Sequence, residues 1–171
     1  MKLDFGPRGA LIIDDATITY QNFSGRETQY NREGNRNFAV IIDERYYDEL
    51  IRLGWNVKTR INKETGELIF YYLPVKVQFN GNTLDPNVYL VSLGKQNKLE
   101  EENVGILDKI AISNVNMDIR RRDWNINGKT GVTAYLSGMQ VFQEVDRFAA
   151  EYFQDGTTVE SEDYDDDPLP F

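Results

Sequence analysis

Short runs of apolar and β-branched residues, separated by polar turns, dominate the hydrophobic pattern of this chain. These runs alternate between apolar and polar positions or are continuously apolar, as strands of a half-buried or buried sheet are. The predicted strands cover residues 10–20, 38–42, 55–62, 67–79, 88–93, 110–121 and 132–145. A break in the alternation near Ser113 is typical of a β-bulge. Strands do not alternate with helices, so the pattern favours antiparallel hairpins over a parallel βαβ sheet.

Helix signals are few. Asp43 is a candidate N-cap for a short helix over residues 44–53 that Gly54 ends, and a second short helix is predicted over residues 146–153. Residues 63–66 and 124–128 read as turns, while residues 95–108 show no clear pattern. The sequence therefore predicts an all-β fold, a small barrel or sandwich with one or two short helices. The leading candidate is an OB-fold, a five-stranded antiparallel barrel, with extra strands or hairpins.

The charge distribution divides the chain into two parts. Residues 154–171 contain seven acids and no Lys or Arg, so they account for −7 of the net charge of −9 and leave −2 for residues 1–153. The acidic segment contains too few apolar residues to fold alone, so we expect a disordered acidic tail. Residues 1–153 form the predicted domain.

Composition narrows the functional class. The chain has no His and no Cys, which excludes catalytic triads and dyads built on His and zinc sites built on either residue. We expect no cofactor, no metal site and no enzymatic activity, although carboxylate chemistry with magnesium stays open. No apolar run is long enough to span a membrane and no signal peptide is evident, and the absence of Cys fits a reducing cytoplasm.

The acidic tail ends in an apolar tip. The tip residues are Asp165, Asp166, Asp167, Pro168, Leu169, Pro170 and Phe171. Two prolines limit the conformational entropy lost on docking, and Phe171 offers an aromatic anchor beside the terminal carboxylate. This combination suits a partner pocket with a hydrophobic floor and a basic rim. The alternative is a tail that only keeps the protein in solution.

The tip resembles that of the bacterial single-stranded DNA-binding proteins (SSB), which close with an Asp-Asp-Asp-x-Pro-Phe-like sequence. The body is more similar to SSB-like proteins of bacteriophages. The resembling stretches are residues 22–25, 34–38, 54–58 and 128–136. The resemblance implies an OB-fold protein that coats single-stranded DNA in replication, recombination or repair, in the cytoplasm of a bacterial host. It also implies a homo-oligomer and a tip that recruits partner enzymes.

Base stacking and phosphate neutralisation require aromatic and basic residues side by side, and three stretches supply both. The candidate nucleic-acid-binding residues are Trp124, Arg120, Arg122, Lys129, Trp55, Lys58, Arg60, Tyr20, Phe23, Arg26, Tyr30, Arg36 and Tyr72. Trp55 is as compatible with a core position as with stacking, and Phe23 and Tyr30 are as compatible with pinning a loop to the barrel. At most two of Arg120–Arg122 share one face of a strand.

Two other functions stay open at this stage. One is a structural or regulatory β-domain whose tail is a solubiliser. The other is a carboxylate-dependent metal enzyme, for which Asp14 and Asp15 are weak candidates because adjacent strand residues point to opposite faces.

Overall fold

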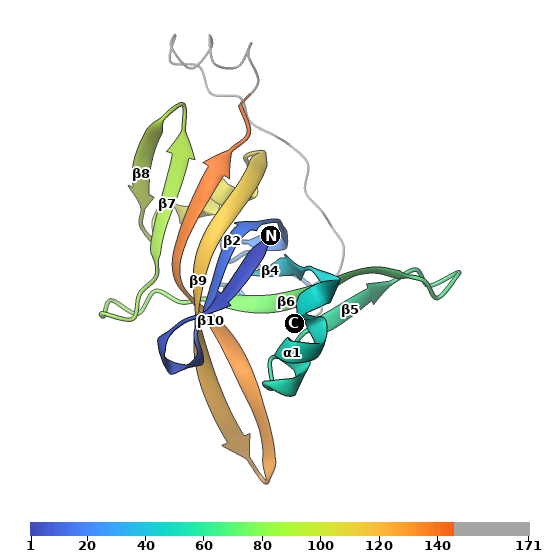
Figure 1. Ribbon diagram of the computed structural model, residues 1–171. Coiled ribbons are helices and arrows are strands. Elements are labelled where there is room, and N and C mark those ends of the chain that lie inside the picture. Colours follow the sequence, from blue (N-terminus) through green and yellow to red (C-terminus); the bar gives the residue numbers. More distant parts are fainter. Residues whose placement is uncertain (146–171) are drawn as a thin grey trace.

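The computed structural model describes residues 1–145, and within them ten strands form a single sheet (Figure 1). The predicted helix over 146–153 and the acidic tail with its tip lie outside the described residues. The strands are β1 (Lys2–Phe5), β2 (Leu11–Ala16), β3 (Ile18–Asn22), β4 (Arg36–Ile42), β5 (Lys58–Ile61), β6 (Leu68–Val77), β7 (Asn87–Ser92), β8 (Lys95–Leu99), β9 (Ile112–Ile126) and β10 (Lys129–Gln143). Short helical segments are η1 (Pro7–Gly9), η2 (Glu44–Tyr46), α1 (Tyr47–Arg52) and η3 (Val104–Asp108).

The sheet curls around one bent segment of chain. The hydrogen-bonded order is β1-β2-β9-β10-β6-β4-β3, so β2 and β3 lie toward opposite ends of the path although only Thr17 separates them in sequence. A register shift between Ile13 and Ala16 and a positive φ of 54° at Asp15 mark a bulge, which bends the strand at this point. The Thr17 carbonyl accepts a hydrogen bond from the Ile41 backbone on β4, so the bend itself bridges the two ends.

The prediction of an all-β, OB-like fold with extra strands is confirmed. Among the described strands no ladder closes the sheet, and five more strands belong to it than a minimal OB-fold has. Most pairs are antiparallel, while β10 pairs in parallel with both β6 and β7. The predicted strand over 10–20 divides at the bend into β2 and β3, and β1 and β8 lie where no strand was predicted.

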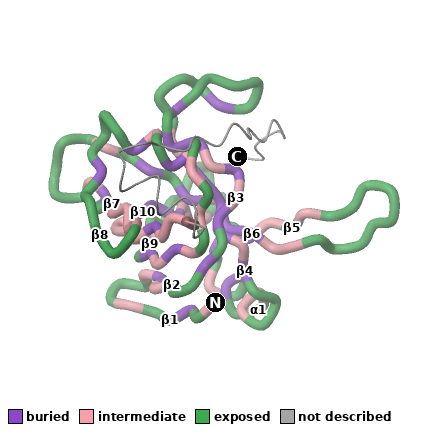
Figure 2. Tube along the Cα trace, turned by 90° about the horizontal axis from the view of Figure 1, so that it is seen from above, coloured by how far each residue is buried: buried purple, intermediate pink, exposed green. Residues whose placement is uncertain are grey.

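The core lies inside the curl. The largest fully buried side chains include Phe23, Phe38, Leu73 and Ile119, which come from four different segments of the sheet and its loops. The predicted helix after Asp43 is present as η2 and α1, and the Asp43 side chain accepts a hydrogen bond from the Arg45 backbone as an N-cap does. Buried positions concentrate where the strands cross, as the tube in Figure 2 shows.

Three hairpins extend from this centre: β5–β6, β7–β8 and the lower half of β9–β10 (Figure 1). The last is the longest, because β9 and β10 have 15 residues each. Its turn is Asn127-Gly128, and both residues have positive φ (52° and 80°), as a two-residue type I′ hairpin requires. The predicted bulge at Ser113 is confirmed, since Phe142 pairs with Asn114 and Gln143 with Ile112, which leaves Ser113 unpaired.

Candidate nucleic-acid interface

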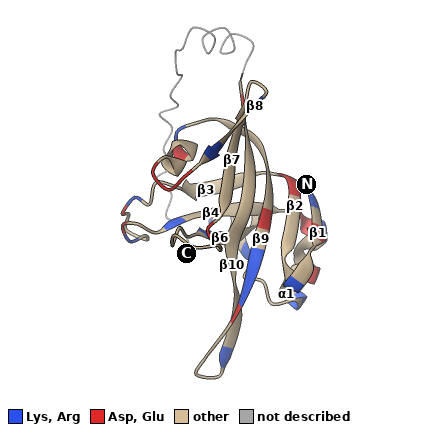
Figure 3. Cartoon of the chain, turned by 90° about the vertical axis from the view of Figure 1, so that its left-hand side faces the viewer, with Lys and Arg blue, Asp and Glu red and all other residues tan. Residues whose placement is uncertain are grey.

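One side of the β9–β10 hairpin carries a basic and aromatic stripe. Residues directly opposite each other in an antiparallel ladder share a face. The pairs on this face are Tyr135 with Arg120, Thr133 with Arg122, Gly131 with Trp124 and Lys129 with Ile126. The four residues predicted here for DNA binding (Arg120, Arg122, Trp124 and Lys129) are therefore brought together, and we call this face the hairpin stripe. Figure 3 shows Lys and Arg colour along β9 where the strand leaves the barrel.

At the upper end of the hairpin stripe two arginines surround one tyrosine. The Arg120 guanidinium carbon lies 4.9 Å from the centroid of the Tyr135 ring, and that of Arg122 lies 6.0 Å from it. Within the part of the chain that the structure describes, neither arginine forms an ion pair. Tyr135 is only 7% exposed, so an incoming base or phosphate would meet the guanidinium planes first. Arginine planes stack on bases and also neutralise phosphates.

Trp124 lies on the strand itself, and the prediction of a turn over residues 124–128 is wrong except for Asn127-Gly128. Its indole lies against Gly131 in the space that a side chain would occupy, because a Cβ placed on that glycine would lie 2.3 Å from the indole Cζ2. Trp124 is nevertheless 39% exposed. One face of the indole is therefore seated on the hairpin and the other is open to a stacking partner.

A groove continues the hairpin stripe across β6 toward the loop over residues 23–35. It consists of two adjoining hollows of about 570 and 330 Å³ that share Gln78 and Asn80. The first is also lined by Tyr30, Asn31, Arg32, Gly34, Asn35, Arg36, Asn37, Lys76, Val77, Phe79 and Glu101, and the second by Leu84, Arg120, Arg122, Tyr135 and Leu136. We call the two hollows together the interface groove.

The interface groove is strongly positive. Its lining contains five cations, of which Arg32, Arg36 and Lys76 lie on the loop side, and one acid, Glu101. Glu101 pairs with Arg36 at 3.4 Å, and the guanidinium carbon of Arg36 lies 5.9 Å from the centroid of Phe79. This excess of positive charge on a chain of net charge −9 marks a local site for a polyanion.

The loop that forms one wall is held at its base by a carboxylate. Asp108 accepts hydrogen bonds from the backbone of Phe23 at 2.8 Å and of Ser24 at 2.9 Å, and from the Ser24 hydroxyl at 2.7 Å. Tyr30 is 49% exposed at the far end of the loop, where a Thr28–Asn31 bridge makes a tight turn. Of the residues predicted on this loop, Tyr30 and Arg36 line the groove, whereas Arg26 is exposed but is not part of its lining.

A second group of predicted residues forms an aromatic cluster on the same side of the sheet. Tyr20 and Tyr72 are 5% and 4% exposed and pack edge to face at 5.5 Å, with Phe70 beside them. Arg60 on β5 donates a hydrogen bond to the Tyr20 hydroxyl and lies over its ring. Burial, together with the nearby Tyr20, raises the pKa of the Tyr72 hydroxyl. Lys58 and Arg60 are half-buried at the edge of this cluster, while the two tyrosine rings are covered.

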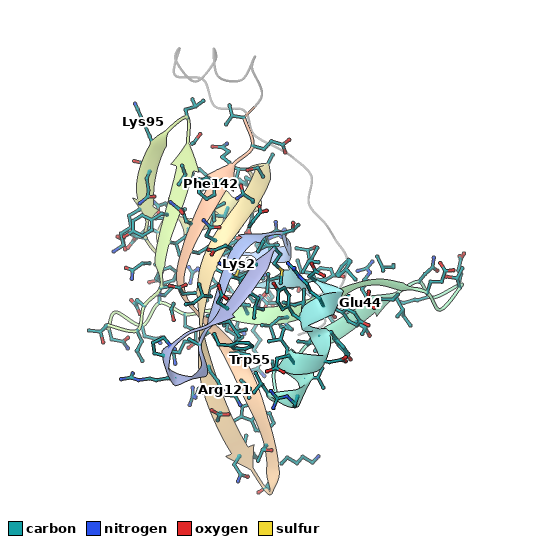
Figure 4. The ribbon with its side chains drawn as sticks, in the orientation of Figure 1. Lys2, Glu44, Trp55, Lys95, Arg121 and Phe142 are labelled. Atoms are coloured by element: carbon teal, nitrogen blue, oxygen red, sulfur yellow. The ribbon has the colours of Figure 1, made fainter. Side chains whose placement is uncertain are left out.

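Two predicted stacking residues are in the core instead. Phe23 is fully buried and stacks on Phe38 at 5.3 Å, and Trp55 is 2% exposed beneath Arg121. Neither ring presents a face to a ligand in this arrangement. Trp55 occupies the core position that was its alternative, and Phe23 is buried at the base of the loop, as a residue that pins the loop would be. Figure 4 shows Trp55 and Arg121 side by side next to α1.

Among the groove residues that sequence reasoning missed are Lys76, Gln78, Phe79 and Tyr135. Tyr135 on β10 pairs with Arg120 of β9 on one side and with Lys76 of β6 on the other. Tyr135 and Lys76 therefore lie on the face of the hairpin stripe. Only the register of β10 against β9 and β6 places them there. Lys76 has aromatic neighbours in Tyr72 and Phe79 but is a single cation, whereas three consecutive arginines stand just before Trp124.

Residues 1–145 contain no group of three or more carboxylates suited to a metal ion, and no helix there is long and apolar enough to cross a membrane. Asp14 and Asp15, the pair considered for magnesium, are both exposed on β2.

Comparison with known proteins identifies a family and a fold. A family model of a phage ssDNA-binding domain matches residues 4–167. The C-terminally truncated single-stranded DNA-binding protein of bacteriophage Enc34 superposes with a TM-score of 0.51 at 11% identity, over 85% of this chain and 97% of that one. The same bacteriophage protein in complex with ssDNA gives 0.51 at 11% identity, over 83% and 90%. At this identity these structures share the fold. No curated protein sequence matches the chain.

Proposed function

Because the chain belongs to the phage ssDNA-binding domain family, we propose that it holds single-stranded DNA along the interface groove and the hairpin stripe. The observation that carries the proposal is the continuity of the two surfaces. Arg120, Arg122 and Tyr135 belong to both, so one path runs from Tyr30 across β6 to Trp124.

The position of this path is the one that OB-folds use for oligonucleotides. These folds bind across their second and third strands, between the loop that follows the first strand and the last hairpin. Here the bent β2–β3 segment corresponds to the first strand, β4 and β6 to the second and third, and β9–β10 to the last hairpin. The groove lies between the loop over residues 23–35 and that hairpin.

The side chains on the path favour binding without regard to sequence. Tyr30 and Trp124 are exposed and can stack on any base, and the half-buried Phe79 lines the groove. Arg32, Lys76, Arg120, Arg122 and Lys129 offer charge to the phosphates. Phosphate neutralisation releases counterions, so affinity should fall as salt rises. A duplex keeps its bases stacked on each other, so it can use the cations but not the rings.

A fluorescence anisotropy titration tests this function directly. Labelled oligo-dT and the corresponding duplex are titrated with the full chain at several salt concentrations, with and without magnesium. The proposal expects tight binding of oligo-dT, weaker binding of duplex, a falling affinity with salt and no magnesium-dependent cleavage. Equal affinity for both substrates, or affinity indifferent to salt, would contradict it.

The tip from Asp165 to Phe171 is proposed to recruit replication, recombination or repair enzymes in the cytoplasm of the bacterial host. Support comes from its acid-rich, proline-limited and aromatic character and its resemblance to the SSB tip. The Phe171→Ala variant should bind oligo-dT as the unaltered chain does, yet lose binding to purified host replication enzymes. If the Phe171→Ala variant and the unaltered chain bind those enzymes equally, the recruitment role fails. Self-association is a separate proposal, which light scattering at several concentrations tests.

A further inference from the structure

The three consecutive arginines on β9 do different things. Arg120 and Arg122 lie on the face of the hairpin stripe, whereas Arg121 points to the opposite face because side chains alternate along a strand. From the sequence alone, all three arginines of this basic run would be expected to contact phosphates. The contacts of Arg121 argue against that assignment for the middle residue.

Arg121 packs against two segments of the barrel, one around Gly9 and one at residues 53–55. Its Nη1 donates a hydrogen bond to the Leu53 carbonyl at 2.7 Å, at the end of α1. Its guanidinium carbon lies 5.4 Å from the centroid of the buried Trp55 ring. A Cβ atom built on Gly9 would lie 3.1 Å from its Cδ, so this glycine leaves room for the side chain, while one built on Gly54 would be in ordinary contact with its Nη2 at 3.6 Å.

The charge of Arg121 is already neutralised. Asp123, two residues along the same face, accepts from Nε at 3.1 Å and from Nη2 at 2.9 Å. These hydrogen bonds lower the pKa of the Asp123 carboxyl, which therefore stays ionised at neutral pH. The Arg121 side chain is about one-fifth exposed.

The arm of the hairpin needs such an anchor. The ladder between β2 and β9 ends at the Leu11–Ile119 pair, and the ladder between β6 and β10 ends at Ala134–Val75. Beyond these, a single bridge between Trp55 and Val132 joins the hairpin to the barrel. An isolated two-stranded ribbon is only marginally stable in water and bends easily. Arg121 lies where the arm leaves the barrel, beside that bridge.

We infer that Arg121 is a positioning residue, which fixes the angle between the β9–β10 arm and the barrel and so keeps Trp124 and Lys129 in line with the interface groove. It acts on DNA through the arm and does not contact phosphate. The inference extends the proposed function, and the expected effect of Arg121 on DNA affinity rests on that proposed function. The anchoring itself is a property of the free protein.

The test compares Arg121→Gln and Arg121→Lys with Arg122→Gln as the matched control. Lysine keeps the charge but loses the planar fork that reaches Leu53 and Asp123 together. Amide hydrogen exchange of the free protein is measured over residues 122–131, and oligo-dT affinity is measured at several salt concentrations. Both Arg121 variants should raise exchange in the arm by about tenfold, because hydrogen bonds to a charged group are lost. Both should weaken affinity while leaving its salt dependence unchanged.

Arg122→Gln should do the reverse. Exchange in the arm stays as in the unaltered chain, and the slope of log affinity against log salt becomes shallower by about 0.7, the value for one phosphate contact to a single strand. The inference is overturned if Arg121→Gln makes the slope shallower by as much as Arg122→Gln, or if Arg121→Lys behaves as the unaltered chain in exchange. Should Arg121→Gln fail to fold, the lysine variant decides. If the unaltered chain does not prefer single strands, the proposed function fails, while the exchange result still decides the anchoring.

Discussion

Trp124 provides a quantitative test of stacking, because its surroundings limit what its loss can cost. One indole face is seated on Gly131 and the other is open, so the residue can stack on one base. Stacking on an aromatic side chain is worth about 1–3 kcal/mol per base, so Trp124→Ala should weaken oligo-dT binding by about 5- to 150-fold. No charge is removed, so the salt dependence of binding should stay the same.

The assay is anisotropy of labelled oligo-dT at several salt concentrations, with circular dichroism to show that the variant is folded. Trp124→Phe keeps a ring face and should recover most of the affinity. Phe5→Ala removes another exposed ring, 47% exposed on β1 and outside the proposed path, and should have no effect. An affinity of Trp124→Ala within twofold of the unaltered chain, or a loss equalled by Phe5→Ala, would refute stacking at this site.

Three further predictions address the wall of the groove, the core and the tail. Asp108→Ala removes the acceptor that holds residues 23 and 24. We expect the free energy of unfolding, measured by urea titration, to fall by about 1–3 kcal/mol, and oligo-dT binding, measured by anisotropy, to weaken. An unchanged urea midpoint would contradict this role of Asp108. Phe23→Ala opens a cavity in the core and should lower the unfolding free energy by about 3–5 kcal/mol, while oligo-dT affinity of the folded protein stays unchanged. A loss of oligo-dT affinity in the folded Phe23→Ala variant would indicate that Phe23 contributes to the interface after all. Residues 155–171 carry a charge of −7, which we expect to compete with DNA for the basic groove. Deleting them should therefore raise affinity at low salt, and the difference should vanish at high salt; equal affinity at low salt would exclude this competition.

The hydrophobic pattern predicted the strands that have one buried face, and it failed where both faces are exposed. β4, β6 and the upper half of β9 carry buried side chains at alternate or successive positions, and in β7 Val88 is buried and the four residues after it are half-buried. In β8 only Leu99 is buried, and in β1 only Leu3, so neither strand has a period to detect. The lower part of β9 is exposed from Arg122 onward, which hid three strand residues inside a predicted turn. The Asn127-Gly128 pair was the available signal for the true turn.

Interface residues that lie close together in sequence could be predicted, whereas residues brought together by pairing of distant strands could not. Arg120, Arg122, Trp124 and Lys129 could be chosen from local spacing, and the register of one hairpin places them on one face. Lys76 and Tyr135 depend on a parallel pairing between strands about 60 residues apart, which no local pattern encodes. Trp55 was ambiguous because its burial depends on Arg121 closing over it, a contact that the same long-range register creates.

The most direct test of where DNA lies is photo-crosslinking of the full chain to oligo-dT substituted with 5-bromouracil, followed by mass spectrometry of the linked peptides. Binding along the interface groove and the hairpin stripe predicts crosslinks at Trp124, Tyr30 and Phe79, with none at Phe5 on β1 or at the β7–β8 hairpin. Crosslinks confined to those outside positions, or equal yields from single-stranded and duplex DNA, would contradict the proposed path.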